Sequence, residues 1–204
     1  GWDLMQKFIA HVKSYEVPLL EGEVQSVVRD EAGFVITMEG GTEYLTRLVI
    51  FANGMMHRKL GVPGEEQYAG KGVHYCYTCD GPLYKNKILA VVGGSDSAAL
   101  GSLFLAGYAS QIYTIFRKER LTAEPVSTEK VEVHPKIKLI PNANVTEIVG
   151  AAGRVATLKL DTGTDLTVDG LFIEVGHLPM SSLAKSVGVS LDERGYIIEN
   201  RKQE

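Results

Sequence analysis

Hydrophobic positions at the start of the chain recur with the period of an amphipathic helix. Over residues 2–15, four apolar side chains share one helical face: Trp2, Met5, Ile9 and Val12. Shorter runs with the period of a strand follow, separated by turn signals at residues 30–31 and 40–41. The pattern predicts one helix and then a β-meander, with strands at residues 24–29, 33–38, 42–45 and 47–51.

The middle of the chain alternates strand and helix patterns. A compact apolar run at residues 87–92 predicts a buried strand, residues 97–109 predict a helix, and residues 111–116 predict a second strand. This βαβ order predicts a parallel sheet, because the helix carries the chain back to the start of the next strand. Further strands are predicted at residues 136–149, 155–160, 166–168 and 171–175. The fold class is therefore α/β, with a Rossmann-like βαβ unit and a parallel sheet.

The bulk composition narrows the classes of partner. The 204 residues carry a formal net charge of −4, and 45% of them are hydrophobic and 23% charged, as in ordinary globular proteins. This balance predicts neither nucleic acid nor an anionic membrane as a partner. No apolar run approaches the ~20 residues of a membrane span, and the first residues lack the pattern of a signal peptide. With only two cysteines, close together, the chain is expected in the cytoplasm.

Those two cysteines, Cys76 and Cys79, are three positions apart, a spacing that allows a small disulfide ring. Half of a zinc site with His74 is one alternative, but such a site normally needs four Cys or His ligands, and the chain has no second cysteine pair. Two buried free cysteines are another alternative. The adjacent Asp80 favours redox chemistry, because a carboxylate beside a thiol pair can carry protons. We therefore predict a redox pair and no metal site.

A glycine-containing turn follows the predicted strand at residues 87–92. It consists of Gly93, Gly94, Ser95, Asp96, Ser97 and Ala98, and it opens the predicted helix. This is the setting of a dinucleotide fingerprint, in which backbone N–H groups and the helix dipole hold a pyrophosphate. Gly93 would supply the tight turn, and Ala98 would allow close packing of the helix on the strand. An ordinary strand-to-helix turn is the alternative, because Ser95 stands where the fingerprint has its second glycine.

Two cations, Arg117 and Lys118, follow the second strand of the βαβ unit. NAD-binding units carry an acidic residue at this position, where it binds the ribose 2′-hydroxyl. Cations there suit the 2′-phosphate of NADPH instead. The alternative is a solvated basic turn, because Glu119 and Arg120 complete a run of mixed charge. We predict NADPH rather than NADH as the bound nucleotide.

Several segments together resemble the low-molecular-weight thioredoxin reductases, a class of pyridine nucleotide-disulfide oxidoreductases. Residues 76–81 match the signature C-x-T-C-D-G, and residues 93–98 are similar to the turn G-G-G-[ND]-[ST]-A. Ala52, Asn53 and Gly54 resemble the A-T-G turn beside the flavin. Residues 176–179, which include His177, resemble the G-H-x-P segment where the chain returns to the flavin domain.

The resemblance implies that a nicotinamide-binding domain interrupts an FAD-binding domain. It implies a partial FAD-binding domain at residues 1–57, an NAD(P)H-binding domain with the cysteine pair at residues 58–175, and a return segment at residues 176–204. Electrons would pass from NADPH to FAD, to the cysteine pair and then to thioredoxin or a thioredoxin-like protein, with Asp80 as proton donor or acceptor. His177 would contact NADPH and residues 52–54 would contact FAD. The intact protein would be a homodimer whose domains rotate between half-reactions.

The chain also departs from the family at several positions. The G-x-G-x-x-G flavin fingerprint and the late G-D segment are absent, so we expect an internal piece of the enzyme that is inactive alone. Ser95, Phe116 and Thr122 replace the glycine, histidine and arginine that the family uses for NADPH, and Asn53 and Met180 also differ from the family pattern. Two alternatives therefore stay open: a related flavoprotein disulfide reductase with a donor other than NADPH, and a nicotinamide-binding redox module without catalysis.

Overall fold

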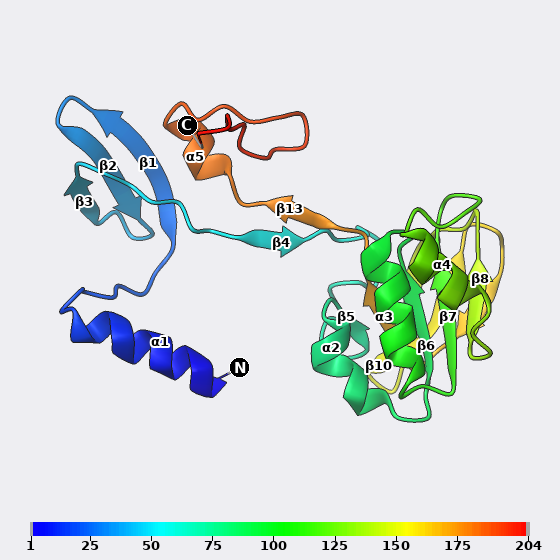
Figure 1. Cartoon of the computed structure of the whole chain (residues 1–204). Helices are drawn as coiled ribbons and strands as arrows, with labels where there is room; N and C mark the ends of the chain where they lie inside the picture. The colour runs from blue at the N-terminus through cyan, green and yellow to red at the C-terminus, as the bar shows by residue number, and fades with distance from the viewer. Residues whose placement is uncertain (1, 203–204) are drawn as a thin grey trace. The chain divides into compact units, whose positions relative to one another are not determined.

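The computed structural model describes residues 2–202, and the chain divides into two compact units (Figure 1). The smaller unit holds the chain up to Gly54 and again from Pro179 onwards, and the larger unit spans Met55–Leu178. Where the chain passes between them, β4 (Met55–His57) and β13 (His177–Pro179) form a short two-stranded sheet. The helices within residues 2–202 are all too short or too polar to cross a membrane. In sequence, the larger unit is an insertion in the smaller one.

The smaller unit is built from a helix and an antiparallel meander. α1 (Trp2–Ser14) comes first, as the helical period predicts. The strands of the meander are β1 (Val24–Asp30), β2 (Gly33–Met38) and β3 (Glu43–Thr46). Each pairs antiparallel with the next, so the predicted meander is confirmed over these three strands. α5 (Ser182–Ser186) packs on β1, where the Ser186 hydroxyl donates a hydrogen bond to the Val27 carbonyl oxygen at 2.9 Å.

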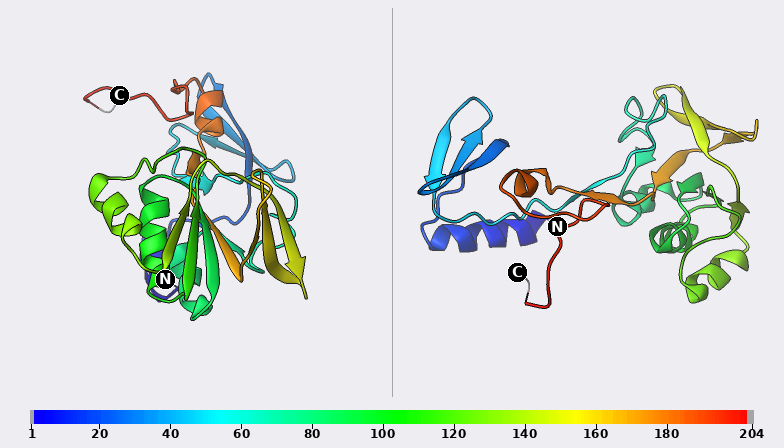
Figure 2. Two further views of the ribbon diagram at one scale, coloured as in Figure 1. Left: turned by 90° about the vertical axis from the view of Figure 1, so that its right-hand side faces the viewer. Right: turned by 90° about the horizontal axis from the view of Figure 1, so that it is seen from above.

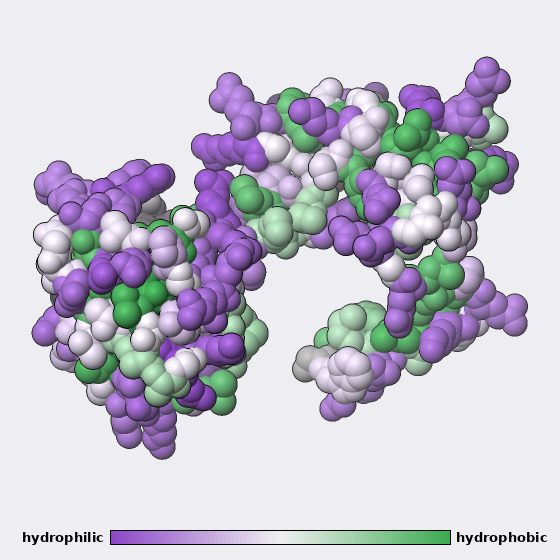
Figure 3. Space-filling model, turned by 180° about the vertical axis from the view of Figure 1, so that it is seen from behind, coloured by the Kyte–Doolittle hydropathy of each residue, from purple (hydrophilic) through white to green (hydrophobic). Residues whose placement is uncertain are grey.

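The strand predicted at residues 47–51 is wrong. These residues form a loop in which the side chains of Leu48 and Ile50 are 82% and 92% exposed. A strand requires a neighbour that satisfies its backbone N–H and C=O groups, and within residues 2–202 no strand pairs with this segment. The apolar side chains of α1 are exposed as well, and Figure 3 shows such side chains at the surface of the smaller unit.

The larger unit contains a five-stranded parallel sheet of order β5-β12-β6-β7-β8. Its strands are β5 (Val73–His74), β12 (Gly170–Ile173), β6 (Ile88–Val92), β7 (Gln111–Ile115) and β8 (Ile137–Ile140). α3 (Asp96–Ala106) connects β6 to β7, and α4 (Pro125–Glu132) connects β7 to β8. Both helices cover the same face of the sheet (Figures 1 and 2). The predicted α/β class and its parallel βαβ unit are thereby confirmed.

An antiparallel sheet covers the opposite face of the parallel sheet. It is formed by β9 (Val145–Ala151), β10 (Arg154–Leu160) and β11 (Asp165–Thr167). Side chains of β6 alternate between the two layers: Leu89 and Val91 pack with the helices, and Ala90 and Val92 pack with the antiparallel sheet. Because both faces of this central strand are buried, its sequence is a continuous apolar run rather than an alternating one.

Two details of the larger unit differ from the sequence-based expectation. The apolar pattern over residues 136–149 breaks at residues 141–144 into β8 and β9, where Pro141 lacks a backbone donor and Asn142 has a φ of 54°. The pattern also misses α4, because only Ser127 and Val131 of its residues are buried. Proline at the first position of this helix, Pro125, is the sequence signal that marks its start.

Candidate functional site

Cys76 and Cys79 form a disulfide at the start of the short helix α2 (Tyr77–Asp80), with an S–S distance of 2.08 Å. The Sγ atom of Cys76 accepts a hydrogen bond from the Cys79 backbone N–H at 3.2 Å. Cys79 is exposed and Cys76 is half-buried, so the disulfide can be reached from solvent. Within residues 2–202 no group of three or more His, Cys, Asp or Glu side chains is placed to hold a metal ion. The two sulfurs are bonded to each other, as a redox pair requires, rather than arranged as zinc ligands or free thiols.

Close packing fixes the disulfide turn on α3. Tyr77 lies against Gly101 of α3, where an added Cβ would be 3.0 Å from the tyrosine ring. The Tyr77 ring also contacts the Phe104 ring, with centroids 5.6 Å apart. The chain continues from α2 directly into a 3₁₀ turn, η1 (Gly81–Tyr84), which packs on the same helix. The helix that opens at the glycine turn therefore also carries the disulfide segment.

His74 links Asp80 to Tyr84 beside the disulfide turn. His74, on β5, is 8% exposed and stacks on Phe172 with ring centroids 5.2 Å apart. Its Nδ1 atom lies 3.2 Å from Asp80 Oδ2, and its Nε2 atom lies 2.7 Å from the Tyr84 hydroxyl oxygen. Burial lowers the pKa of His74 and outweighs the nearby Asp80, which raises it. The cysteine spacing suggests His74 only as a zinc ligand, whereas the structure pairs it with Asp80.

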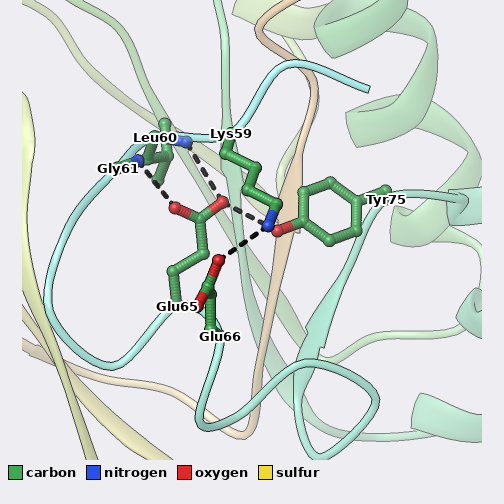
Figure 4. A network of polar contacts seen from close by, with 6 residues as sticks. All are labelled: Lys59, Leu60, Gly61, Glu65, Glu66 and Tyr75. Atoms are coloured by element: carbon green, nitrogen blue, oxygen red, sulfur yellow. Dashed lines mark hydrogen bonds and ion pairs between the residues drawn. The ribbon is translucent and has the colours of Figure 1, made fainter. Parts of the chain in front are cut away.

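A buried carboxylate holds the segment before the disulfide in place (Figure 4). Glu65, which is 1% exposed, accepts hydrogen bonds from the backbone N–H groups of Leu60 and Gly61 at 3.1 and 2.7 Å. It also accepts one from the Tyr75 hydroxyl at 2.7 Å. Burial, the larger cause, raises the pKa of Tyr75, and the hydrogen bond to Glu65 raises it further. The Tyr75 hydroxyl therefore stays a donor. Three donors offset the loss of water around the carboxylate and tie the segment at Leu60 to the residue before Cys76.

The glycine turn lies at the carboxyl end of β6. Gly93 has a φ of 148°, and a Cβ there would collide with the carbonyl oxygen of Glu174, the residue after β12. The same Cβ would lie 2.9 Å from the Cβ of Ala98, which is fully buried in α3. Only glycine fits this junction of β6, β12 and α3. The packing supports the roles predicted for Gly93 and Ala98.

A cleft of about 450 Å³ opens at the carboxyl ends of β6, β7 and β12. Gly93, Gly94 and Ser95 line one part of it. Five cationic side chains also line it: Arg58, Lys59, Arg117, Lys118 and Arg120. Ligands of open α/β sheets bind at this edge, where the chain leaves neighbouring strands toward opposite sides. The position, the glycine turn and the positive charge suit an elongated anion such as a dinucleotide.

The other predicted site residues lie outside the wall of this cleft. Asp96 Oδ1 accepts a hydrogen bond from the Glu124 backbone N–H at 2.7 Å, so it joins α3 to the start of α4. Ser97 is half-buried in the first turn of α3. His177, on β13, lies against His57, with ring centroids 4.5 Å apart and ring planes tilted by 45°. The residues expected beside the flavin are exposed: Ala52, Asn53 and Gly54.

Glu174 is a cleft residue that the sequence pattern does not reveal. It is 6% exposed and lines the cleft next to Gly93. Burial raises the pKa of Glu174 to about 7, because loss of water disfavours the ionised carboxylate. In the sequence Glu174 is a single polar residue within the apolar run at residues 171–175. It reaches the cleft only because β12 pairs with β6.

We expect Glu174→Gln to remove a pH dependence of the free energy of unfolding. The pKa of Glu174 rises from an ordinary 4.5 to about 7 on folding, so its neutral form is the one that the folded state favours. The corresponding stability is fully present below about pH 4.5 and is lost as the pH rises to about 7. Between about pH 4.5 and 7, the free energy of unfolding of the wild-type chain should fall by about 1–2 kcal/mol relative to that of the variant. This range is reduced to allow for screening of the carboxyl group by water at the cleft.

Urea unfolding at about pH 4.5, 6 and 8 measures this difference. Glu129→Gln, at an exposed position of α4, is the matched control and should follow the wild-type pH dependence. Parallel pH curves for the wild type and Glu174→Gln would contradict the expectation.

Comparison with known proteins places the whole chain in one family. The family model described as pyridine nucleotide-disulphide oxidoreductase matches residues 5–204. The thioredoxin reductase of Listeria innocua is 35% identical over 207 residues, which cover 99% of this chain and 64% of that protein. The thioredoxin reductase of Bacillus subtilis is 34% identical over 209 residues, which cover 100% of this chain and 66% of that protein. The chain thus spans just under two thirds of the length of these relatives.

Solved structures agree with the sequence relatives. The crystal structure of Lactococcus lactis thioredoxin reductase in the FR conformation superposes with a TM-score of 0.81 at 29% identity, over 99% of this chain and 68% of that chain. The thioredoxin reductase of T. acidophilum gives a TM-score of 0.78 at 36% identity, over 99% of this chain and 67% of that chain. Together with the glycine turn and the exposed disulfide, these matches confirm the resemblance. The chain belongs to the pyridine nucleotide-disulphide oxidoreductase family, and its relatives there are the low-molecular-weight thioredoxin reductases.

Proposed function

We propose that the whole protein is a thioredoxin-disulfide reductase that passes electrons from NADPH through FAD to the Cys76–Cys79 disulfide and on to thioredoxin or a thioredoxin-like protein. One observation carries the proposal. An exposed disulfide with an adjacent carboxylate, Asp80, lies in the same compact unit as a basic cleft with a glycine turn. A nucleotide site without the disulfide would suit many dehydrogenases, and a disulfide without the cleft would lack a source of electrons.

The residues of the cleft suit NADPH. Gly93 leaves room for a pyrophosphate at the start of α3, and we assign Arg117 and Lys118 to the 2′-phosphate. NADPH supplies two electrons as a hydride when it is bound. The exposed residues 52–54 do not by themselves enclose a flavin, so FAD is assigned to the whole protein from its family alone.

In the exchange step, the reduced cysteine pair gives two electrons to the thioredoxin disulfide. A thiolate of the pair attacks one sulfur of that disulfide, whose S–S bond breaks as a mixed disulfide forms. The second cysteine then attacks the mixed disulfide, the Cys76–Cys79 bond re-forms, and thioredoxin leaves as a dithiol. We assign Asp80 to the proton that one thiol must lose and a departing sulfur must gain.

The larger unit, Met55–Leu178, supports an assignment of residues 58–175 as the NAD(P)H-binding domain. We assign residues 1–57 and 176–204 to the FAD-binding domain. From the family we further propose a homodimer in the cytoplasm that has neither a nucleic acid nor a membrane as partner.

A reductase with a donor other than NADPH is the second candidate. It is favoured by Ser95, Phe116 and Thr122, all of which line the cleft where the family has other residues.

Exchange with thioredoxin tests the proposal on the 204-residue chain. The chain is reduced with a dithiol, freed of reductant and mixed with oxidised thioredoxin. Because thioredoxin lies at about −270 mV, the cysteine pair should reduce a measurable fraction of it, and Cys76→Ser should reduce none. Absence of exchange by the wild-type chain would show that thioredoxin is not the acceptor.

We expect the 204-residue chain to purify with little or no bound flavin. Residues 52–54 are exposed, and the neighbouring apolar side chains of Leu45, Leu48 and Ile50 are 80%, 82% and 92% exposed. Such a surface does not shield an isoalloxazine ring from water. Absorbance at the flavin wavelengths relative to protein measures the bound fraction, and one flavin per chain would contradict the expectation.

A further inference from the structure

We propose that His74 is a positioning residue that donates a hydrogen bond from Nδ1 to the Asp80 carboxylate and so keeps this side chain ready to exchange protons with the cysteine pair. The proposal rests on the proposed function only in that the Cys76–Cys79 pair performs thiol–disulfide exchange. His74 lies two residues before Cys76, outside the cysteine pair and outside the family signature C-x-T-C-D-G.

The geometry around His74 defines a chain of three polar groups. The imidazole is wedged between Asp80 at the end of α2 and Tyr84 at the end of η1, at 3.2 and 2.7 Å respectively. Its ring stacks on Phe172 of β12, which holds the ring plane. The imidazole is 8% exposed, and the Asp80 side chain is 33% exposed. The middle group of the three, His74, is therefore buried, and Asp80 reaches the surface next to Cys79.

The hydrogen-bond partners assign the imidazole tautomer. Burial lowers the pKa of His74, so the ring is neutral and has one donor and one acceptor nitrogen. Nδ1 faces Asp80 Oδ2, a carboxylate oxygen that accepts, so the ring proton is on Nδ1. Nε2 is then the acceptor of the Tyr84 hydroxyl, and burial raises the pKa of Tyr84, so this hydroxyl keeps the proton that it donates. The other charged groups that act on Tyr84 are Arg154 and Asp169, and their effects oppose each other.

A donor aimed at one carboxylate oxygen has two consequences. It fixes the orientation of Asp80, whose backbone N–H is already held by the Cys76 carbonyl oxygen at 3.1 Å. It also leaves the second carboxylate oxygen available to take the proton of an attacking thiol.

Two variants of His74 separate positioning from simple filling of space. Asparagine can place an amide N–H near the position of Nδ1, whereas glutamine can place one near Nε2 but leaves Asp80 without its donor. Both variants lose the ring stacked on Phe172 and leave a similar defect in the core. A purely structural role therefore predicts similar effects for the two, and the positioning role predicts different ones.

The test measures how fast the reduced 204-residue chain reacts with iodoacetamide and with oxidised thioredoxin, as a function of pH. His74→Gln should slow exchange by roughly tenfold and move the pH–rate profile up by about 0.5–1 unit. His74→Asn should keep a profile close to that of the wild type. Tyr84→Phe keeps the ring but frees Nε2 from its donor, and it should produce part of the shift seen in His74→Gln.

Thermal melting of each variant accompanies the kinetics. If His74→Gln and His74→Asn change the profile equally, or if neither changes it, the positioning role is wrong. If both variants fail to fold, Tyr84→Phe decides, and an unshifted profile in that variant overturns the proposal. If the wild-type chain fails to reduce thioredoxin but its thiols show the expected pH profile with iodoacetamide, the acceptor is wrong and the role of His74 stands.

Discussion

Asp80→Asn should slow reduction of thioredoxin by the cysteine pair by about 10²- to 10⁴-fold, the range of positioned acid–base catalysis. The variant keeps the size of the side chain and an oxygen that can accept the hydrogen bond from His74, which lies 3.2 Å from the carboxylate. It removes the carboxylate's negative charge and its capacity to take up and release a proton. Exchange then depends on water for the proton that a departing sulfur needs.

Stopped-flow mixing of the reduced variant with oxidised thioredoxin measures the rate. Asp165→Asn, at an exposed position of β11, is the matched control and should exchange at the wild-type rate. In the reductase proposed for the whole protein, reduction of flavin by NADPH should be unaffected by Asp80→Asn, because the proton is needed only at the thiols. A wild-type rate of thioredoxin reduction in Asp80→Asn would make this residue structural.

The second prediction with a large expected effect is a preference for NADPH over NADH. The wild-type chain should bind NADPH about tenfold to a hundredfold more tightly than NADH, because one charge-assisted contact to the 2′-phosphate contributes about 1.5–3 kcal/mol. Arg117 and Lys118 lie just after the end of β7, beyond Phe116, and line the cleft. Arg117→Ala should abolish most of the preference and leave the affinity for NADH almost unchanged.

Calorimetric titration of both nucleotides measures the two affinities. Lys130→Ala, at an exposed position of α4, removes one positive charge away from the cleft and is the matched control. The preference should also weaken as salt is added, since ionic strength screens contacts between charges. Equal affinities for NADPH and NADH, or no binding of either, would favour the reductase that uses another donor.

Local signals in the sequence predict much of the fold and of the candidate site of this protein. The continuous apolar run of β6 identified a buried strand, and the two cysteines identified a disulfide, because each signal lies within a few consecutive residues. The turn after β6 could be read from Gly93 and Ala98 for the same reason, although the sequence did not name their partner. The family followed from the order of several such segments along the chain.

The tertiary structure decided what depends on distant parts of the chain. Glu174 reaches the cleft because β12 pairs with β6 more than seventy residues earlier in the sequence, and nothing near Glu174 marks it as a site residue. His74 is close to Asp80 in sequence, but only the packing of β5 against Phe172 turns its ring toward that carboxylate. Residues 47–51 have the pattern of a strand yet form none, since a strand needs a neighbour and propensity alone does not supply one.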